Sequence, residues 1–142
     1  MTRFDASLPA PIITPVSRPF WDGCLQGVLR VQRCAQCSRY RFYPSETCPS
    51  CASSDYAWND VSGKGRVASW IVIHRSVDPA WSARTPFASG VVEIDEQPGC
   101  FIPGVIEGID PSAIVVGQRV EVRFERIGDS TALPRWQALK TQ

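Results

Sequence analysis

Residues 34–51 read C-A-Q-C-S-R-Y-R-F-Y-P-S-E-T-C-P-S-C and contain two C-x-x-C pairs, Cys34 with Cys37 and Cys48 with Cys51. The ten residues between the pairs are enough for a short hairpin that brings both pairs together. Four thiolates that converge in this way form a closed tetrahedral site, which suits a structural Zn²⁺. A closed site has no open position for substrate or water, so we expect the metal to hold the local fold and not to take part in catalysis.

The composition is that of an ordinary globular protein. The chain has 142 residues, of which 44% are hydrophobic and 20% charged, and its formal net charge is +1. Nucleic-acid-binding proteins usually carry a strong basic excess, so this charge argues against a nucleic-acid partner. No apolar run approaches the roughly 20 residues of a membrane span, and no secretory signal is visible. We therefore expect a cytoplasmic protein without a membrane partner, whose paired cysteines hold metal.

The segment before the cysteines predicts an arm and a helix. Residues 1–16 contain three prolines and no regular period, which indicates an extended N-terminal arm. Ser17 is typical of a helix N-cap, and Gly27 is typical of a helix end. Between them, Phe20 and Trp21 lie on one apolar face of a short helix. This face either packs on the body of the protein or binds a partner, and the sequence leaves both interpretations open.

Three short strands are expected around the cysteine pairs. Alternating residues at 28–33 predict the first strand, residues 41–43 the return strand, and residues 55–61 the third. Zinc-ribbon turns often have Gly directly after the second cysteine of each pair, because φ is positive there. This chain has Ser38 and Ala52 instead. The three strands and the two cysteine pairs nevertheless predict that residues 17–60 form the helix plus a zinc ribbon.

From residue 61 onward the pattern is that of β-strands. Strands are expected at residues 66–75, 88–95, 100–106, 119–126 and 135–140, with a short helical turn between the third and the fourth. This is the element order of an OB-fold barrel. The predicted fold class is therefore all-β, with a five-stranded OB-fold barrel over residues 61–142 preceded by a short N-terminal helix and a zinc ribbon.

The first barrel strand is one candidate for ligand binding. Strict alternation along this strand places Val67, Ile71 and Ile73 on one face and Trp70 and His74 on the other. On the binding face of a barrel, Trp70 and His74 could contact an adenine ring or an extended acyl chain. The alternative is that Trp70 packs the barrel against the ribbon or the helix, as a tryptophan in the middle of a strand usually does.

The loop at residues 76–87 is the second candidate for ligand binding. It carries Trp81, Arg84 and Phe87 between two predicted strands. Long loops with aromatic residues on a rigid barrel are typical of binding sites, and OB barrels use flanking loops for specificity. We therefore expect these three residues to contribute to a binding surface.

Catalytic parts are few in this sequence. His74 is the single histidine, and no Ser-His-acid or Cys-His arrangement can be assembled without it. A nucleotide-binding fingerprint and a metal-hydrolase helix are both missing from the motifs. We predict no catalytic residues, and a scaffold or binding module is favoured over an enzyme that works alone.

Four motifs follow one another in an order that is specific as a combination. Residues 20–37 fit F-W-x-G-x-x-x-G-x-L-x-x-Q-x-C-x-x-C, and residues 42–51 fit F-Y-P-x-x-x-C-P-x-C. V-S-G-K-G-R-V follows at 61–67 and V-G-Q-R-V-E-V-R-F-E at 116–125. Over about residues 17–140 the chain resembles the acyl-CoA-associated OB-fold family with an N-terminal rubredoxin-like zinc ribbon, also known as domain of unknown function thirty-five.

The resemblance implies a non-catalytic companion of thiolase-fold enzymes, namely thiolases, synthases and the retro-aldolases of steroid side-chain degradation. The chain would form a hetero-oligomer with such an enzyme and help to form its acyl-CoA site, with Phe20 and Trp21 on the docking side. Two alternatives remain open at this point. One is a nucleic-acid-binding zinc-ribbon and OB module, and the other is a rubredoxin-like electron carrier in which iron replaces zinc.

Overall fold

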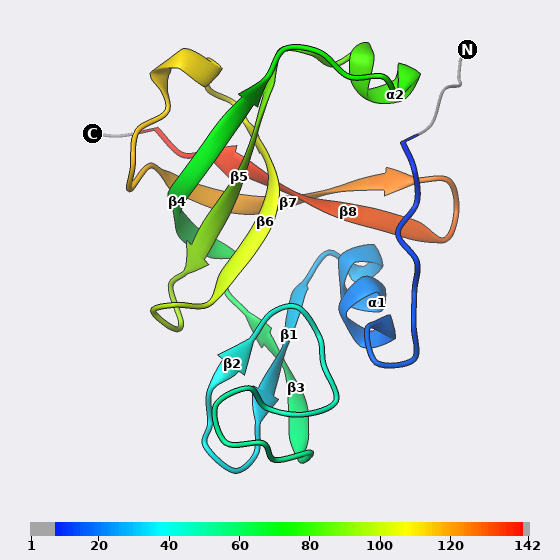
Figure 1. Cartoon of the computed structure of the whole chain (residues 1–142), viewed down its shortest axis with the longest axis vertical. Coiled ribbons are helices and arrows are strands. Elements are labelled where there is room, and N and C mark those ends of the chain that lie inside the picture. Colours follow the sequence, from blue (N-terminus) through cyan, green and yellow to red (C-terminus); the bar gives the residue numbers. More distant parts are fainter. Residues whose placement is uncertain (1–7, 141–142) are drawn as a thin grey trace.

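The computed structural model describes residues 8–140, so the first seven residues of the predicted N-terminal arm lie outside the described residues. A small three-stranded sheet and a closed barrel lie one above the other, and a helix lies beside the junction between them (Figure 1). The elements in chain order are α1 (Arg18–Gln26), β1 (Leu29–Cys34), β2 (Tyr40–Arg41), β3 (Tyr56–Val61), β4 (Lys64–Ile73), α2 (Pro79–Ser82), β5 (Phe87–Ile94), β6 (Phe101–Glu107), the 3₁₀ turn η1 (Pro111–Ala113), β7 (Arg119–Ile127) and β8 (Thr131–Ala138).

Helix α1 begins after Ser17 and ends at Gly27, as the sequence predicts. Gly27 has a φ of 80°, and its N–H donates to the carbonyl of Cys24 at 3.2 Å, which closes the last turn. Phe20 and Trp21 are buried, and the ring of Phe20 lies 5.1 Å from that of Phe42. The apolar face of α1 therefore packs on the body of the protein, against β1 and β8.

The ribbon is an antiparallel sheet in the order β2-β1-β3. Strand β2 ends at Arg41, two residues earlier than predicted, because a buried side chain draws the following segment away from the sheet. Gln32 of β1 donates to the carbonyl of Ser45 at 3.0 Å and accepts from the Ser45 N–H at 2.8 Å. Gln32 also accepts from Nε of Arg41 at 3.0 Å. These bonds fix the loop that carries the second cysteine pair.

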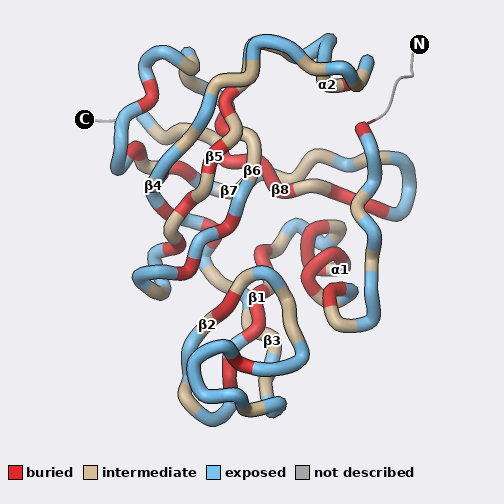
Figure 2. Tube along the Cα trace, viewed as in Figure 1, coloured by how far each residue is buried: buried red, intermediate tan, exposed pale blue. Residues whose placement is uncertain are grey.

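The barrel is closed in the spatial order β4-β5-β6-β8-β7. Along the chain, η1 lies between β6 and β7, the third and fourth barrel strands. This arrangement confirms the predicted OB-fold. The parallel pairing of β6 with β8 covers only Val105 to Glu107 on β6, so the antiparallel β7–β8 pair extends beyond the barrel towards α1 (Figure 1). Buried residues lie along β5, β6 and β8 and continue into α1 and β1 (Figure 2), which makes one core of barrel, helix and ribbon.

The strict alternation predicted for the first barrel strand is wrong beyond Val67. The pairing of β4 with β5 shifts register between Val67 and Ser69, which is the mark of a β-bulge. A bulge adds one residue and thereby exchanges the two faces of the strand. Val67 is 1% exposed, but Ile71 is 64% exposed, while Trp70 packs against the core opposite Gly90.

The loop at residues 76–87 contains one regular element that the sequence did not predict. Helix α2 begins after Asp78, whose carboxylate accepts from the N–H of Ala80 at 2.8 Å. This side-chain cap and Pro79 start a single helical turn.

No helix among residues 8–140 is both long enough and apolar enough to span a bilayer.

Candidate functional site

The four cysteines of the ribbon converge on one point. All four sulfurs lie within 4.8 Å of one another, and the pairs Cys34–Cys51 and Cys37–Cys48 are each 3.6 Å apart. A tetrahedral zinc site with bonds of about 2.3 Å separates its sulfurs by about 3.8 Å. The donor set and its spacing therefore fit Zn²⁺ with no further protein ligand.

Each cysteine pair is held in a tight turn with positive φ after its second cysteine. Ser38 has a φ of 67° and Ala52 a φ of 66°. The N–H of Ser38 donates to the carbonyl of Cys34 at 3.0 Å, and that of Ala52 donates to the carbonyl of Cys48 at 2.8 Å. Both residues thus take the left-handed conformation that Gly adopts most easily, and each gives up about 1 kcal/mol by doing so.

The surroundings prepare the sulfurs unequally for metal binding. Backbone N–H groups directed at the sulfurs, chiefly that of Cys37 for Cys34 and that of Cys51 for Cys48, lower both pKa values, and the pKa of Cys48 falls to about 6. The amide of Ser53 acts in the same sense on Cys51, but desolvation and the neighbouring sulfurs raise its pKa to about 11. A bound dication offsets the repulsion between neighbouring thiolates, because it stabilises all four of them together.

A second candidate site is an apolar groove at the junction of helix, ribbon and barrel, which we call the aromatic groove. Its volume is about 330 Å³. Residues of β6 and β8 line it together with Phe20, Trp21, Phe42, Tyr43, Trp81 and Arg135. The first two come from α1, the next two from the loop after β2, and Trp81 from α2. Ser89 of β5 lines the groove as well, so the tertiary fold collects residues from six segments at one surface.

A small charged cluster fixes α2 and β8 at one side of this groove. Arg84 donates to both carboxylate oxygens of Glu125, at 3.0 and 2.8 Å, and Arg135 donates through Nε at 3.0 Å. The guanidinium carbon of Arg135 also lies 5.4 Å from the ring centre of Trp81. The hydrogen bonds from Arg84, together with the charge of Arg135, lower the pKa of Glu125 to about 2. The carboxylate therefore stays ionised between two cations.

The predicted ligand-facing residues do not form one site. Phe20, Trp21 and Trp81 meet in the aromatic groove. Arg84 and Phe87 line, again with Trp81, a separate pocket of about 230 Å³ that reaches η1.

Two further predicted residues lie elsewhere. His74 is exposed just beyond β4 and lines a different shallow pocket with Val77 and Thr85. Trp70 packs against the barrel core, which was the alternative interpretation of that residue.

Arg135 and Tyr43 of the groove were missed as site residues. Tyr43 is 49% exposed, and Arg135 is 3% exposed. The local sequence around Arg135 gives no sign that this arginine is buried. Its partner Glu125 lies on another strand, where it is one of several alternating charged residues that the sequence predicts to be exposed. For Tyr43, the usable signal was its residue type, since tyrosine is enriched at interfaces.

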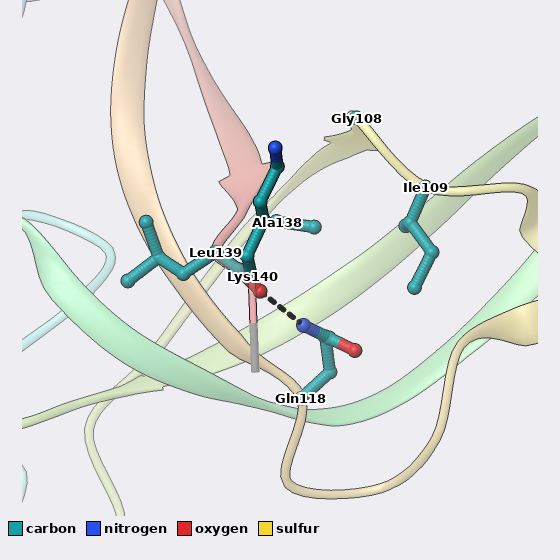
Figure 3. Close-up of a pocket in the computed structure, with 6 residues that line it drawn as sticks. All are labelled: Gly108, Ile109, Gln118, Ala138, Leu139 and Lys140. Carbon is teal, nitrogen blue, oxygen red and sulfur yellow. Dashed lines mark hydrogen bonds between the residues drawn. The ribbon is translucent and has the colours of Figure 1, made fainter. Parts of the chain in front are cut away.

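A further pocket lies at the opposite end of the barrel from the aromatic groove. It has a volume of about 370 Å³, and its lining residues lie just after β6, just before β7 and at the end of β8 (Figure 3). Gln118 donates to the carbonyl of Leu139 at 3.1 Å across it. Lys140 is its one ionisable lining residue, so this pocket holds no pair of groups for acid–base chemistry.

Two family models match consecutive parts of the chain. The ChsH2 rubredoxin-like zinc ribbon domain matches residues 21–57, and the ChsH2 C-terminal OB-fold domain matches residues 58–125. The boundary between the two matches falls inside β3, the last strand of the ribbon.

Curated relatives include a probable enoyl-CoA hydratase alpha subunit of Thermomonospora curvata, 31% identical over 126 residues. The match covers 89% of this chain but only 38% of that relative. A DUF35 domain-containing scaffold protein of Methanocaldococcus jannaschii is 33% identical over 106 residues, which are 73% of this chain and 70% of the relative.

A solved structure described as Ltp2-ChsH2(DUF35) aldolase has a chain of the same fold. The TM-score is 0.80 at 29% sequence identity, and the match covers 90% of this chain and 98% of that one. Helix, ribbon and barrel are thus all part of the common fold. The chain belongs to the DUF35 family, in the form that joins a ChsH2-type rubredoxin-like zinc ribbon to a C-terminal OB-fold domain.

Proposed function

We propose that this protein is a non-catalytic accessory subunit that binds a thiolase-fold enzyme, such as a thiolase, synthase or retro-aldolase, and helps to form its acyl-CoA site. The similarity to the Ltp2-ChsH2(DUF35) aldolase carries the proposal, because it covers 98% of the solved chain. Two archaeal relatives are named DUF35 domain-containing scaffold proteins, which agrees with a supporting role.

The chemistry of the described cysteines also favours a non-catalytic role. The four ribbon sulfurs leave a bound zinc ion no position for a substrate. The other two cysteines, Cys24 and Cys100, are buried. Burial raises the pKa of Cys24 to about 12 and that of Cys100 to about 11, so both remain protonated thiols and poor nucleophiles.

The substrate class of the proposed assembly is an acyl-CoA. A relative from Mycobacterium tuberculosis is named 3-oxo-4,17-pregnadiene-20-carboxyl-CoA hydratase alpha subunit, and 31% identity over 106 residues links it to this chain. The match covers only 32% of that relative. We therefore propose a steroid-derived acyl-CoA as the substrate of the assembly. We also propose that the assembly works in the cytoplasm, where the ribbon thiols stay reduced.

Co-purification tests this function. The tagged full-length chain is isolated from its own cells, and the assembly is characterised by light scattering and mass spectrometry. We expect a stoichiometric hetero-oligomer with a thiolase-fold protein, and carbon–carbon cleavage of acyl-CoA substrates only when that protein is present. A chain that is monodisperse alone and captures no such protein contradicts the proposal. A captured complex that nuclease or moderate salt disperses favours the nucleic-acid module instead.

A further inference from the structure

We infer that Arg41 of β2 supplies the positive charge that balances the zinc-bound thiolates of the ribbon, and that this charge controls how firmly the site retains its metal. The role concerns the ribbon alone. It therefore goes beyond the proposed function and can be tested without any partner enzyme.

Arg41 is a buried cation whose observed partners are all neutral. The residue is 7% exposed. Its Nε donates to Oε1 of Gln32 at 3.0 Å, and its Nη2 donates to the carbonyl of Ser45 at 2.8 Å. Its guanidinium carbon lies 5.0 Å from the ring centre of Tyr56. No ion pair joins Arg41 to a carboxylate of the described residues, and a buried charge without a counter-charge is unfavourable.

The other buried arginine among residues 8–140 does have a counter-charge. Arg135 is 3% exposed, and its Nε donates to the carboxylate of Glu125 at 3.0 Å. This is the usual arrangement for a charge removed from water. The contrast indicates that Arg41 is balanced by an anion of another kind.

The strand register places Arg41 on the face of the ribbon sheet that carries Cys34. Gln32 of β1 pairs with Arg41 of β2, and Cys34 of β1 pairs with Tyr56 of β3. Residues directly opposite each other, and residues two apart along a strand, point to the same face, so these four side chains share one face. Strand β1 lies between β2 and β3 (Figure 1). Because the guanidinium of Arg41 reaches the ring of Tyr56, it extends across β1 on the side where Cys34 lies.

The thiolate cluster is the anion on that face. Its four sulfurs lie within 4.8 Å of one another, and four thiolates around a dication leave two negative charges. Cys34 is 1% exposed, so water and salt screen the attraction between its sulfur and Arg41 only weakly. Arg33 adjoins Cys34 in sequence but is exposed and alternates to the opposite face. Arg39 is exposed as well. Of the arginines next to the cysteines, Arg41 is therefore the one that acts on the cluster most strongly.

The rate of zinc release from the zinc-loaded full-length chain tests this role, with a colorimetric chelator in excess as the probe. Arg41→Gln removes the charge and should release zinc roughly ten- to hundredfold faster, the usual effect of losing a residue that supports a metal ligand. Arg41→Lys keeps the charge but loses the planar fork, and should stay within about fivefold of the wild-type rate. Arg39→Gln removes an exposed charge from the same ribbon, so it is the matched control and should release zinc at the wild-type rate.

The reduction potential of the iron-loaded chain separates the charge of Arg41 from its hydrogen bonds. Four thiolates also hold iron in place of zinc, and one-electron reduction of that iron makes the site more negative by one charge. A nearby cation favours the reduced form, so Arg41→Gln should lower the potential. A tenfold loss of this preference corresponds to a fall of about 59 mV. Arg41→Lys and Arg39→Gln should both keep a potential close to that of the wild type.

Several results overturn the inference. Wild-type zinc release from Arg41→Gln shows that the cluster needs no charge from this residue. Faster release at an unchanged iron potential shows that the hydrogen bonds of Arg41 to the loop matter and its charge does not. Equal changes in Arg39→Gln show a general effect of the charge on the ribbon. If Arg41→Gln takes up no metal, Arg41→Lys decides, because uptake with nearly wild-type release supports the inference and no uptake overturns it. None of these outcomes depends on whether a thiolase-fold protein binds.

Discussion

Arg135 of β8 donates through Nε to Glu125 of the neighbouring strand β7 at 3.0 Å, and this bond places a buried guanidinium at the edge of the aromatic groove. Arg84, from the segment after α2, reaches the same carboxylate with two hydrogen bonds. One acidic side chain therefore joins the barrel to the loop that carries Trp81. Breaking either contact should affect both the stability of the barrel and the shape of the groove.

The stability contributed by Glu125 should depend on pH. The pKa of Glu125 is lowered to about 2 in the folded protein, against about 4.3 in an unfolded chain. A lowered folded-state pKa gives stability that is present above about pH 4.3 and is lost as pH falls towards 2. In urea unfolding, the wild type should lose about 2 kcal/mol more than Glu125→Gln between about pH 5 and pH 2. Glu121→Gln, at an exposed carboxylate on the same strand, is the control and should follow the wild type. Parallel curves for the wild type and Glu125→Gln contradict this prediction.

Removal of one metal ligand should unfold the ribbon. Cys34→Ser leaves three thiolates, and structural zinc supplies on the order of 10 kcal/mol to modules of this kind. We expect loss of bound zinc by elemental analysis and loss of partner binding, while circular dichroism retains the barrel signal. Cys24→Ser, at a buried cysteine outside the site, should keep its zinc. A Cys34→Ser variant with full zinc content shows that the site is misassigned, and a coloured iron protein from low-oxygen purification supports the electron carrier instead.

Glycine at either positive-φ position of the ribbon, Ser38 or Ala52, should stabilise the zinc-bound ribbon. Ser38→Gly and Ala52→Gly each relieve a left-handed conformation, and each should stabilise the zinc-bound ribbon by about 0.5–1 kcal/mol. The rate of zinc transfer to a chelator at fixed temperature measures this effect, and both variants should release zinc more slowly. Ser50→Gly, next to the same cysteines but without positive φ, should release zinc at the wild-type rate or faster. Faster release from the first two variants contradicts the expectation.

A methyl group at Gly90 should damage the barrel. A Cβ there would lie 2.7 Å from the carbonyl oxygen of Ser69 and 2.7 Å from Cδ1 of Ile106. The contact with backbone cannot be relieved by a rotamer change, so Gly90→Ala should lower the free energy of unfolding by about 2–3 kcal/mol. Thermal unfolding measures this loss, with Ser69→Ala at an exposed position of the paired strand as the control. A Gly90→Ala melting temperature equal to that of the control argues against the close approach of β4 and β5.

Local sequence signals determined the metal site, the helix and the order of the elements. The spacing of Cys34, Cys37, Cys48 and Cys51 predicts the convergence of their sulfurs, because tight turns fix each pair and a hairpin joins them. Gly27 marks the end of α1 because this cap depends on the adjacent backbone alone. Ser17 precedes the first helical residue as predicted, but its hydroxyl bonds to Thr14 and does not cap the helix. The five strands and the turn η1 follow from periodicity and turn residues in the same way.

Only the tertiary structure decided which residues meet in the groove and which face of β4 enters the core. The bulge between Val67 and Ser69 depends on the pairing of β4 with β5, so the alternation of β4 alone placed Ile71 on the wrong face. Arg135 became a buried site residue through Glu125 and Arg84, which approach from two other segments. Such contacts join residues that are distant in the chain, and no local propensity encodes them. The sequence by itself therefore determined the zinc ribbon and the barrel, whereas long-range packing determined which side chains meet at the aromatic groove.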